Sequence, residues 1–163
     1  MRVLVKNAKV IDGNSALNGK RRDILIENGL VKRIGTKLRS TSSSKVIEGK
    51  NLHVSPGWFD LSVNYCDPGE EFKEDLKSGA EASLAGGFTG VLLNSDTTPS
   101  ISTKSDIEYI LSRNKNSVLD IFPSGTLSEK GKGSNINEMY DLHNAGVAAF
   151  HDNKSTLGPG LLL

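Results

Sequence analysis

From residue 58 onward the sequence alternates between short apolar strands and amphipathic helices, and this alternation restricts the fold more than any other feature. Strand patterns lie at 58–64, 89–94, 118–122 and 147–150, and helix patterns lie at 73–85, 104–114 and 136–145. Strands separated by helices of this length pair in parallel through right-handed crossovers. The sequence therefore predicts an α/β fold with a parallel sheet.

The helix patterns have recognisable faces and ends. In the helix pattern at 73–85, Leu76, Ala80 and Leu84 lie four residues apart and share one face. Gly86-Gly87 is expected to end this helix. Ser102 or Thr103 is expected to cap the second helix.

Residues 1 to about 54 show short strands with no helix between them. The segments 23–27 and 30–34 flank Asn28-Gly29, which predicts a tight hairpin because both turn residues accept positive φ. A polar stretch rich in serine and threonine, 37–45, is expected to be a loop. We predict a small β-sandwich-like domain at 1–54 and an α/β domain at 55–163.

The length of the chain limits what the α/β domain can be. A complete eightfold α/β barrel takes about 250 residues, whereas this chain has 163. Four strands and three helices make about half a barrel, and Leu161-Leu162-Leu163 suggests the start of one more helix. We expect a truncated barrel, and the chain being a fragment of a longer protein is one interpretation. The strand residues expected to point inward, towards the missing strands, are Leu61, Val63, Val91, Leu93, Leu119, Ile121, Val147 and Ala149.

Composition excludes several classes of function. Twenty Lys and Arg against 19 Asp and Glu give no electrostatic basis for binding nucleic acid or a membrane surface. No apolar run reaches the roughly 18 residues of a membrane span, and the first residues lack the pattern of a signal peptide. A single cysteine, Cys66, excludes an internal disulfide framework. We expect a cytoplasmic protein.

Polar residues follow each predicted strand, where the ends of parallel strands converge. They are Ser62, Asn64, Cys66, Asn94, Ser95, Asp96, Ser124, His151 and Asp152. Loops at strand ends are polar in most proteins, so this clustering by itself leaves a binding site and an ordinary surface both open.

The segment 56–69, Pro-Gly-Trp-Phe-Asp-Leu-Ser-Val-Asn-Tyr-Cys-Asp-Pro-Gly, resembles the first barrel strand of the dihydroorotases, a family of metal-dependent cyclic amidohydrolases. That family has roughly Pro-Gly-Phe-Ile-Asp-x-His-Val-His-Leu-Arg-Glu-Pro-Gly here. The segments 73–75, 85–89 and 96–99 fit the same family. The resemblance implies the amino-terminal part of a (β/α)8 TIM-barrel amidohydrolase, preceded by a small β-sandwich segment, and a role in pyrimidine biosynthesis.

The chain departs from this family at its most diagnostic positions. Ser62 and Asn64 replace two histidines that bind zinc in the family, and a hydroxyl and an amide are weak zinc ligands. Cys66 stands where the family has an arginine that grips the substrate carboxylate, and Asp96 replaces a substrate-binding asparagine. Asp152 matches an aspartate that the family keeps near the metal. We therefore expect no cofactor and assign no catalytic residue.

Neither the histidines nor the cysteine suggests a substitute site. His53 precedes the first barrel strand, His143 lies in a predicted helix, and only His151 is placed at the strand ends. A lone histidine there is more often structural than a metal ligand. No base is placed beside Cys66 to activate it as a nucleophile.

Two functions remain, and the first is favoured. One is a dihydroorotase-like pseudoenzyme that has lost its metal ligands and has a structural or regulatory role. The other is an active zinc-dependent cyclic amidohydrolase. The expected partner is the remaining barrel segment or a second copy of the chain. The resemblance adds aspartate transcarbamoylase, with which some non-catalytic relatives assemble.

Overall fold

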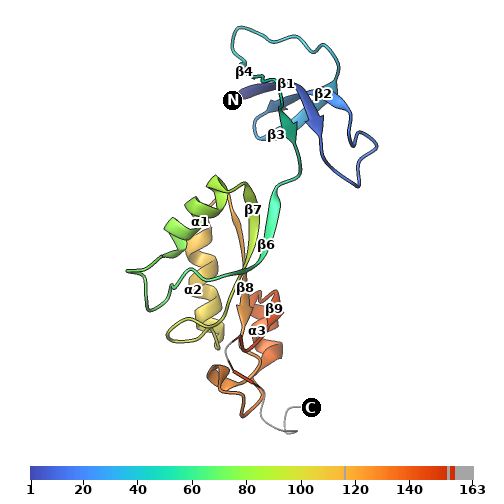
Figure 1. Cartoon of the computed structure of the whole chain (residues 1–163). Helices are drawn as coiled ribbons and strands as arrows, with labels where there is room; N and C mark the ends of the chain where they lie inside the picture. Colours follow the sequence, from blue (N-terminus) through green and yellow to red (C-terminus); the bar gives the residue numbers. More distant parts are fainter. Residues whose placement is uncertain (116, 154, 157–163) are drawn as a thin grey trace. The chain divides into compact units, whose positions relative to one another are not determined.

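The computed structural model describes residues 1–115, 117–153 and 155–156. The chain divides into two compact units, Met1–Pro56 and Gly57–Leu163 (Figure 1).

The first unit is built on one five-stranded sheet. Its strands are β1 (Arg2–Val10), β2 (Arg21–Glu27), β3 (Leu30–Gly35), β4 (Lys45–Ile47) and β5 (His53–Val54). They lie in the order β3-β2-β1-β4, and β5 also pairs with β1. The predicted hairpin between β2 and β3 is confirmed, with φ of 51° at Asn28 and 80° at Gly29. A sandwich would need a second sheet over this one, and it stays a prediction.

The second unit alternates strands and helices. Its elements are β6 (Trp58–Val63), α1 (Leu76–Ala85), β7 (Phe88–Leu93), α2 (Lys104–Asn114), β8 (Asp120–Gly125), the short 3-10 helix η1 (Glu129–Gly131), α3 (Met139–Ala145) and β9 (Ala149–Phe150). The strands pair in parallel in the order β6-β7-β8-β9. The predicted half barrel is confirmed, and the helix start expected at 161–163 lies outside the described residues.

The two longer helices begin at capping boxes. The side chain of Asp75 accepts the backbone N–H of Ser78 at the start of α1, and Thr103 accepts that of Asp106 at the start of α2. These contacts satisfy backbone donors that a helix start leaves unpaired. Within the described part of the chain there is no helix of the length and apolarity that a bilayer crossing requires.

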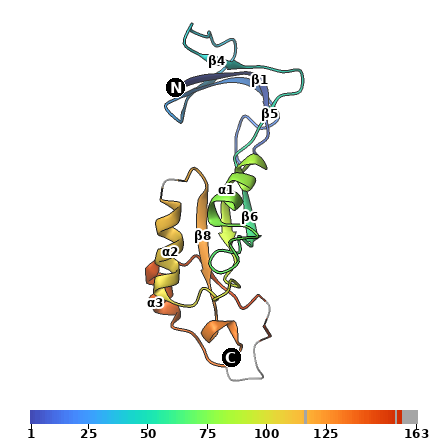
Figure 2. The same ribbon diagram turned by 90° about the vertical axis from the view of Figure 1, so that its left-hand side faces the viewer.

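The core of the second unit lies between the sheet and its helices. Figure 1 and Figure 2 show α1 and α2 along the same side of the sheet, facing the viewer in Figure 2. The buried cluster contains Val91 and Leu93 of β7, Ile121 of β8, and Ile107 and Ile110 of α2, among others. Packing against the helices therefore uses one alternate set of strand residues.

This arrangement corrects an expectation about the open face of the half barrel. The alternation suggested that Val63, Val91, Leu93, Leu119, Ile121, Val147 and Ala149 would face the missing strands together with Leu61. Instead Val91, Leu93, Leu119, Ile121 and Val147 are buried in the core. Parallel strands are apolar on both faces, so the sequence pattern did not distinguish the helix side from the open side.

The open face carries Leu61, which was expected there, and two phenylalanines that were not. Phe59 is 48% exposed, Leu61 74% and Phe122 41%. The rings of Phe59 and Phe122 lie 5.5 Å apart between centroids. Gly90 lies beneath them, where an added Cβ would come within 2.7 Å of the Phe59 ring. We call these four residues the open apolar face, in which the Phe59 and Phe122 rings contact each other and Phe59, Leu61 and Phe122 are accessible to solvent.

Candidate functional site at the strand ends

A bulge in β6 sets the direction of the first two candidate residues. Asp60 pairs with Val91 and Val63 with Leu93, so β6 has three residue steps where β7 has two. The extra residue interrupts the alternation of side chains between the faces of the sheet. Ser62 and the following Asn64 consequently come together on the side where Asn94 lies.

A hydrogen-bond network joins Ser62, Asn64 and Asn94. The amide nitrogen of Asn94 donates to Ser62 Oγ and to Asn64 Oδ1, both at 3.0 Å. The Ser62 hydroxyl also lies in donating position 3.3 Å from Asn94 Oδ1. Asn94 follows β7 and is only 4% exposed, so its amide needs these partners. Each of the three side-chain oxygen atoms accepts one hydrogen bond within the network.

His151 is held by contacts to both ring nitrogens. Its Nδ1 accepts the backbone N–H of Asn153 at 3.2 Å, which places the proton of the neutral ring on Nε2. Nε2 then donates to Ser124 Oγ at 2.8 Å, and the Ser124 hydroxyl donates to the carbonyl of Leu93. In this arrangement the imidazole has no free lone pair for a metal and cannot take a proton from Ser124. The geometry agrees with a structural histidine.

Asp152 serves as an acceptor for the polar loop that follows β8. Its carboxylate accepts the backbone N–H of Leu127 at 2.9 Å and that of Ser128 at 3.1 Å, as well as the Ser128 hydroxyl. Ser128 is buried and its Oγ in turn accepts the N–H of Gly133 at 2.7 Å. This carboxylate therefore organises the loop. Nothing in the sequence indicated the contact between Asp152 and Ser128, because the two residues lie 24 positions apart within polar segments.

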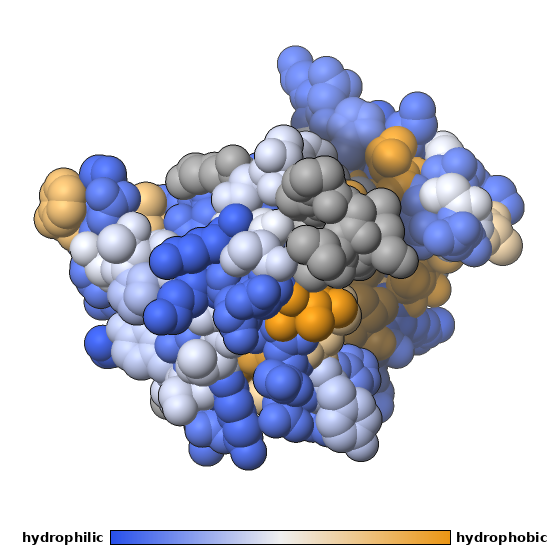
Figure 3. Space-filling view, turned by 90° about the horizontal axis from the view of Figure 1, so that it is seen from below, coloured by the Kyte–Doolittle hydropathy of each residue, from blue (hydrophilic) through white to orange (hydrophobic). Residues whose placement is uncertain are grey.

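The other two substituted positions are Cys66 and Asp96. Cys66 is half-buried and has a φ of 54°, which turns the chain after β6. Asp96 follows β7, and its Oδ2 accepts the side-chain amide of Asn153 at 3.2 Å. Asp96, Asp152 and Asn153 help to line a small cavity of about 270 Å³. The part of the second unit nearest the viewer in Figure 3 is mainly hydrophilic, with a hydrophobic area near its middle.

The residues present do not fit a zinc ion. Ser62 and Asn64 offer neutral oxygen atoms, whereas structural and catalytic zinc sites use imidazole, thiolate and carboxylate. His151 and Asp152 are the ionisable residues at the strand ends that could act as zinc ligands. His151 is hydrogen-bonded to Ser124, and Asp152 is hydrogen-bonded to the loop after β8. Among the residues that the structure describes, no three His, Cys, Asp or Glu side chains are placed to hold a metal together.

Asp67, which the sequence did not single out, connects the segment after β6 to both nearby helices. It is 4% exposed, and its carboxylate accepts the N–H of Leu76 at 3.2 Å and the hydroxyl of Tyr109 at 2.8 Å. Burial, and next the hydrogen bond to Asp67, raise the pKa of Tyr109 above its ordinary value. A sequence cue was present in the Asp-Pro-Gly turn, but nothing in the sequence indicated Tyr109 as the partner.

Comparison with known proteins agrees with the geometry of the fold. A family model described as dihydro-orotase-like matches residues 51–158. Curated dihydroorotases of Aquifex aeolicus and Trichlorobacter lovleyi are each 37% identical, over 95% and 93% of this chain. That of Ruminiclostridium cellulolyticum is 33% identical over 100% of it. The chain spans only 36% of the first two relatives and 38% of the third.

Solved structures show the same architecture. An L-hydantoinase (dihydropyrimidinase) from Arthrobacter aurescens superimposes with a TM-score of 0.65 at 23% identity, covering 91% of this chain and 32% of the other. A dihydroorotase crystal structure gives a TM-score of 0.62 at 16% identity, covering 91% and 41%. At these identities the likeness concerns the fold.

Proposed function

Because this chain belongs to the dihydroorotase-like family, we propose that it acts in pyrimidine biosynthesis as a protein that has lost the hydrolytic step and has a structural or regulatory role. The observation that carries this proposal is the closed network of Ser62, Asn64 and Asn94 at the end of β6. It stands where the resembling family has two zinc-binding histidines.

The chemistry of cyclic amide hydrolysis explains why this substitution matters. A metal ion in such enzymes lowers the pKa of a bound water and polarises the carbonyl that is attacked. Here the available donors are a hydroxyl and an amide, neither of which competes with imidazole for zinc. The carboxylate of Asp152 is occupied by the N–H and hydroxyl groups of the loop after β8.

Substrate recognition would be weakened independently of the metal. A dihydroorotate carboxylate is best held by a guanidinium, which forms two parallel charge-assisted hydrogen bonds. Cys66 offers a thiol at that position, and Asp96 offers a carboxylate that repels an anion. The changes at Cys66 and Asp96 would weaken binding of the substrate carboxylate, whereas those at Ser62 and Asn64 would weaken binding of the metal.

A structural role requires a partner, and we propose polypeptide carrying the other barrel strands as the first one. The support is the extent of the relatives, of which this chain spans about 36%, together with the open apolar face. Aspartate transcarbamoylase is proposed as a further partner on the basis of the family resemblance alone.

The proposal is tested by assaying the purified protein for hydrolysis and formation of dihydroorotate, with and without added zinc, beside the Aquifex aeolicus dihydroorotase as positive control. We expect no turnover above background, and elemental analysis after dialysis is expected to find far less than one zinc per chain. Zinc-dependent turnover would support the alternative, an active cyclic amidohydrolase, which the 37% identity to curated dihydroorotases favours.

A further inference from the structure

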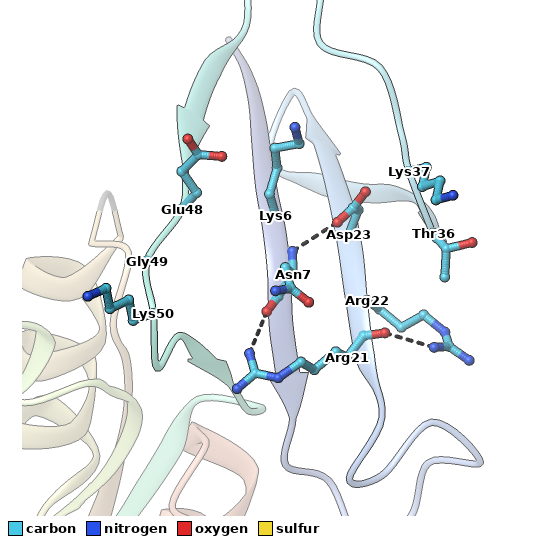
Figure 4. Close-up of a pocket in the computed structure, with 10 residues that line it drawn as sticks. All are labelled: Lys6, Asn7, Arg21, Arg22, Asp23, Thr36, Lys37, Glu48, Gly49 and Lys50. Atoms are coloured by element: carbon cyan, nitrogen blue, oxygen red, sulfur yellow. Dashed lines mark hydrogen bonds between the residues drawn. The ribbon is translucent and has the colours of Figure 1, made fainter.

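A basic groove crosses the sheet of the first unit. It has a volume of about 650 Å³, which is in the range of small-molecule sites. Figure 4 shows Lys6 and Asp23 at its centre, with Glu48–Lys50 on one side and Thr36, Lys37 and Arg22 on the other. Its basic lining residues are Lys6, Arg21, Arg22, Lys37 and Lys50.

A buried carboxylate builds the floor of this groove. Asp23 is 6% exposed, and it accepts the backbone N–H of Asn7 and that of Leu38, each at 2.8 Å. The first contact lies in a bulge of β1, and the second lies in the turn after β3. Asn7 has a φ of 52° and Lys37 a φ of 55°, a region that residues other than glycine seldom adopt. Asp23 thus holds in place two uncommon backbone turns that line the groove.

The cations of the groove outnumber its carboxylates. Five lysine and arginine residues accompany Asp23 and Glu48, and Asp23 is committed to the backbone. Among the described residues, ion pairs form at Arg2–Glu27, Lys73–Glu70 and Lys104–Glu108, but none involves a cation of the groove. Several like charges over one concave surface produce a positive potential that attracts anions.

Two of the cations are oriented by the protein itself. The guanidinium of Arg21 donates to the carbonyl of Asn7 at 2.8 Å, and that of Arg22 donates to the carbonyl of Arg21 at 2.7 Å. Each guanidinium keeps further N–H groups for a ligand, since it carries five. Gly49 adds no side chain to the groove, and an added Cβ there would meet nothing within 4 Å.

We propose that this groove binds a small polyanion carrying two or more phosphate groups. The cations on opposite sides of the groove suit an anion with more than one charged group, and guanidinium groups match phosphate oxygens in pairs. The size of the groove exceeds what a single phosphate fills. This site does not depend on the proposed loss of hydrolysis, because none of its residues lies in the second unit.

The test is isothermal titration calorimetry of the full chain with inorganic pyrophosphate as the probe, beside inorganic phosphate and citrate. Pyrophosphate is expected to bind more tightly than either, with an affinity that falls as salt is raised. The double variant Lys6→Gln with Arg22→Gln should lose at least about tenfold in affinity, because it removes two charge-assisted contacts.

The matched control is the double variant Lys32→Gln with Arg33→Gln, which removes the same two charges from β3 outside the groove. It should bind pyrophosphate as the unchanged protein does, and circular dichroism should show both double variants folded. Equal weakening by the two double variants would overturn the proposal in favour of general attraction to a basic unit. Absence of pyrophosphate binding would overturn it directly, and equally tight citrate binding would overturn the assignment to phosphate.

Discussion

Asn94 links Ser62 and Asn64, the two residues that replace the family's zinc-binding histidines, in one hydrogen-bond network. Its amide joins Ser62 and Asn64, and its own position at 4% exposure makes these contacts necessary. A change at one of the three side chains therefore affects the others. Restoring a metal site would require breaking this network as well as supplying imidazoles.

At this scale we predict that Ser62→His combined with Asn64→His does not produce turnover of dihydroorotate. Even if zinc is bound, Cys66 lacks the charge that would hold the substrate carboxylate. Elemental analysis and a spectrophotometric assay measure the two effects separately. Adding Cys66→Arg to the double variant is the matched comparison, since it restores the charge alone. Turnover by the double variant with Cys66 unchanged would contradict this prediction.

Among the elements, α1 and α2 are linked through Asp67. The carboxylate accepts the first N–H of α1 and the hydroxyl of Tyr109 in the middle of α2. Tyr65, close by in sequence, packs on α1 so tightly that a Cβ added at Gly79 would lie 2.3 Å from its ring. The turn after β6 thus positions both helices against the sheet.

We predict that Tyr109→Phe lowers the free energy of unfolding by about 1 kcal/mol near neutral pH, through the lost hydrogen bond to Asp67. The pKa of Tyr109 is raised in the folded protein. The stability that the protonated hydroxyl contributes is therefore complete below the pKa of tyrosine in the unfolded chain, about 10, and is lost as the pH rises from there through the higher pKa of the folded protein. Urea unfolding at about pH 8 and about pH 11 measures the difference.

Tyr140→Phe is the control for this prediction, since Tyr140 is exposed on α3. It should leave the free energy of unfolding unchanged at both pH values. A destabilisation by Tyr109→Phe that is the same at both pH values would contradict the assigned role of the hydroxyl.

For the molecule as a whole, the open apolar face is the main consequence of having four barrel strands. Parallel sheets are found almost always with both faces covered. Leaving a few hundred Å² of apolar surface in water costs several kcal/mol at roughly 25 cal/mol per Å², which is comparable to the stability of a typical domain. Polypeptide carrying the remaining strands would remove this cost.

We therefore predict that these 163 residues alone do not form a free monomer in solution. Light scattering should give a mass above 17.5 kDa, and Leu61→Glu should shift the mass towards that of the monomer by placing a charge on the open apolar face. Val118→Glu is the control, because Val118 is exposed but lies outside that face. A monodisperse monomer with cooperative unfolding in the unchanged protein would contradict this prediction.

Local patterns in the sequence determined the elements and their order. The alternation from residue 58 predicted the strands and helices of the half barrel, and Asn28-Gly29 predicted the hairpin because few residues tolerate positive φ. Thr103 was among the caps expected for α2. The substituted motif around Ser62 and Asn64 was likewise visible in the sequence alone. Each of these features depends on residues that are close together along the chain.

Tertiary structure alone decided which distant groups meet. Val91 and Leu93 face the helices. The sequence could not predict this side of the sheet for them, because both faces of a parallel strand are apolar. The bulge in β6 that brings Ser62 and Asn64 to Asn94 depends on pairing with β7, and the contact of Asp152 with Ser128 spans 24 positions. Such contacts follow from strand register and loop packing, which a linear pattern of residue types does not contain.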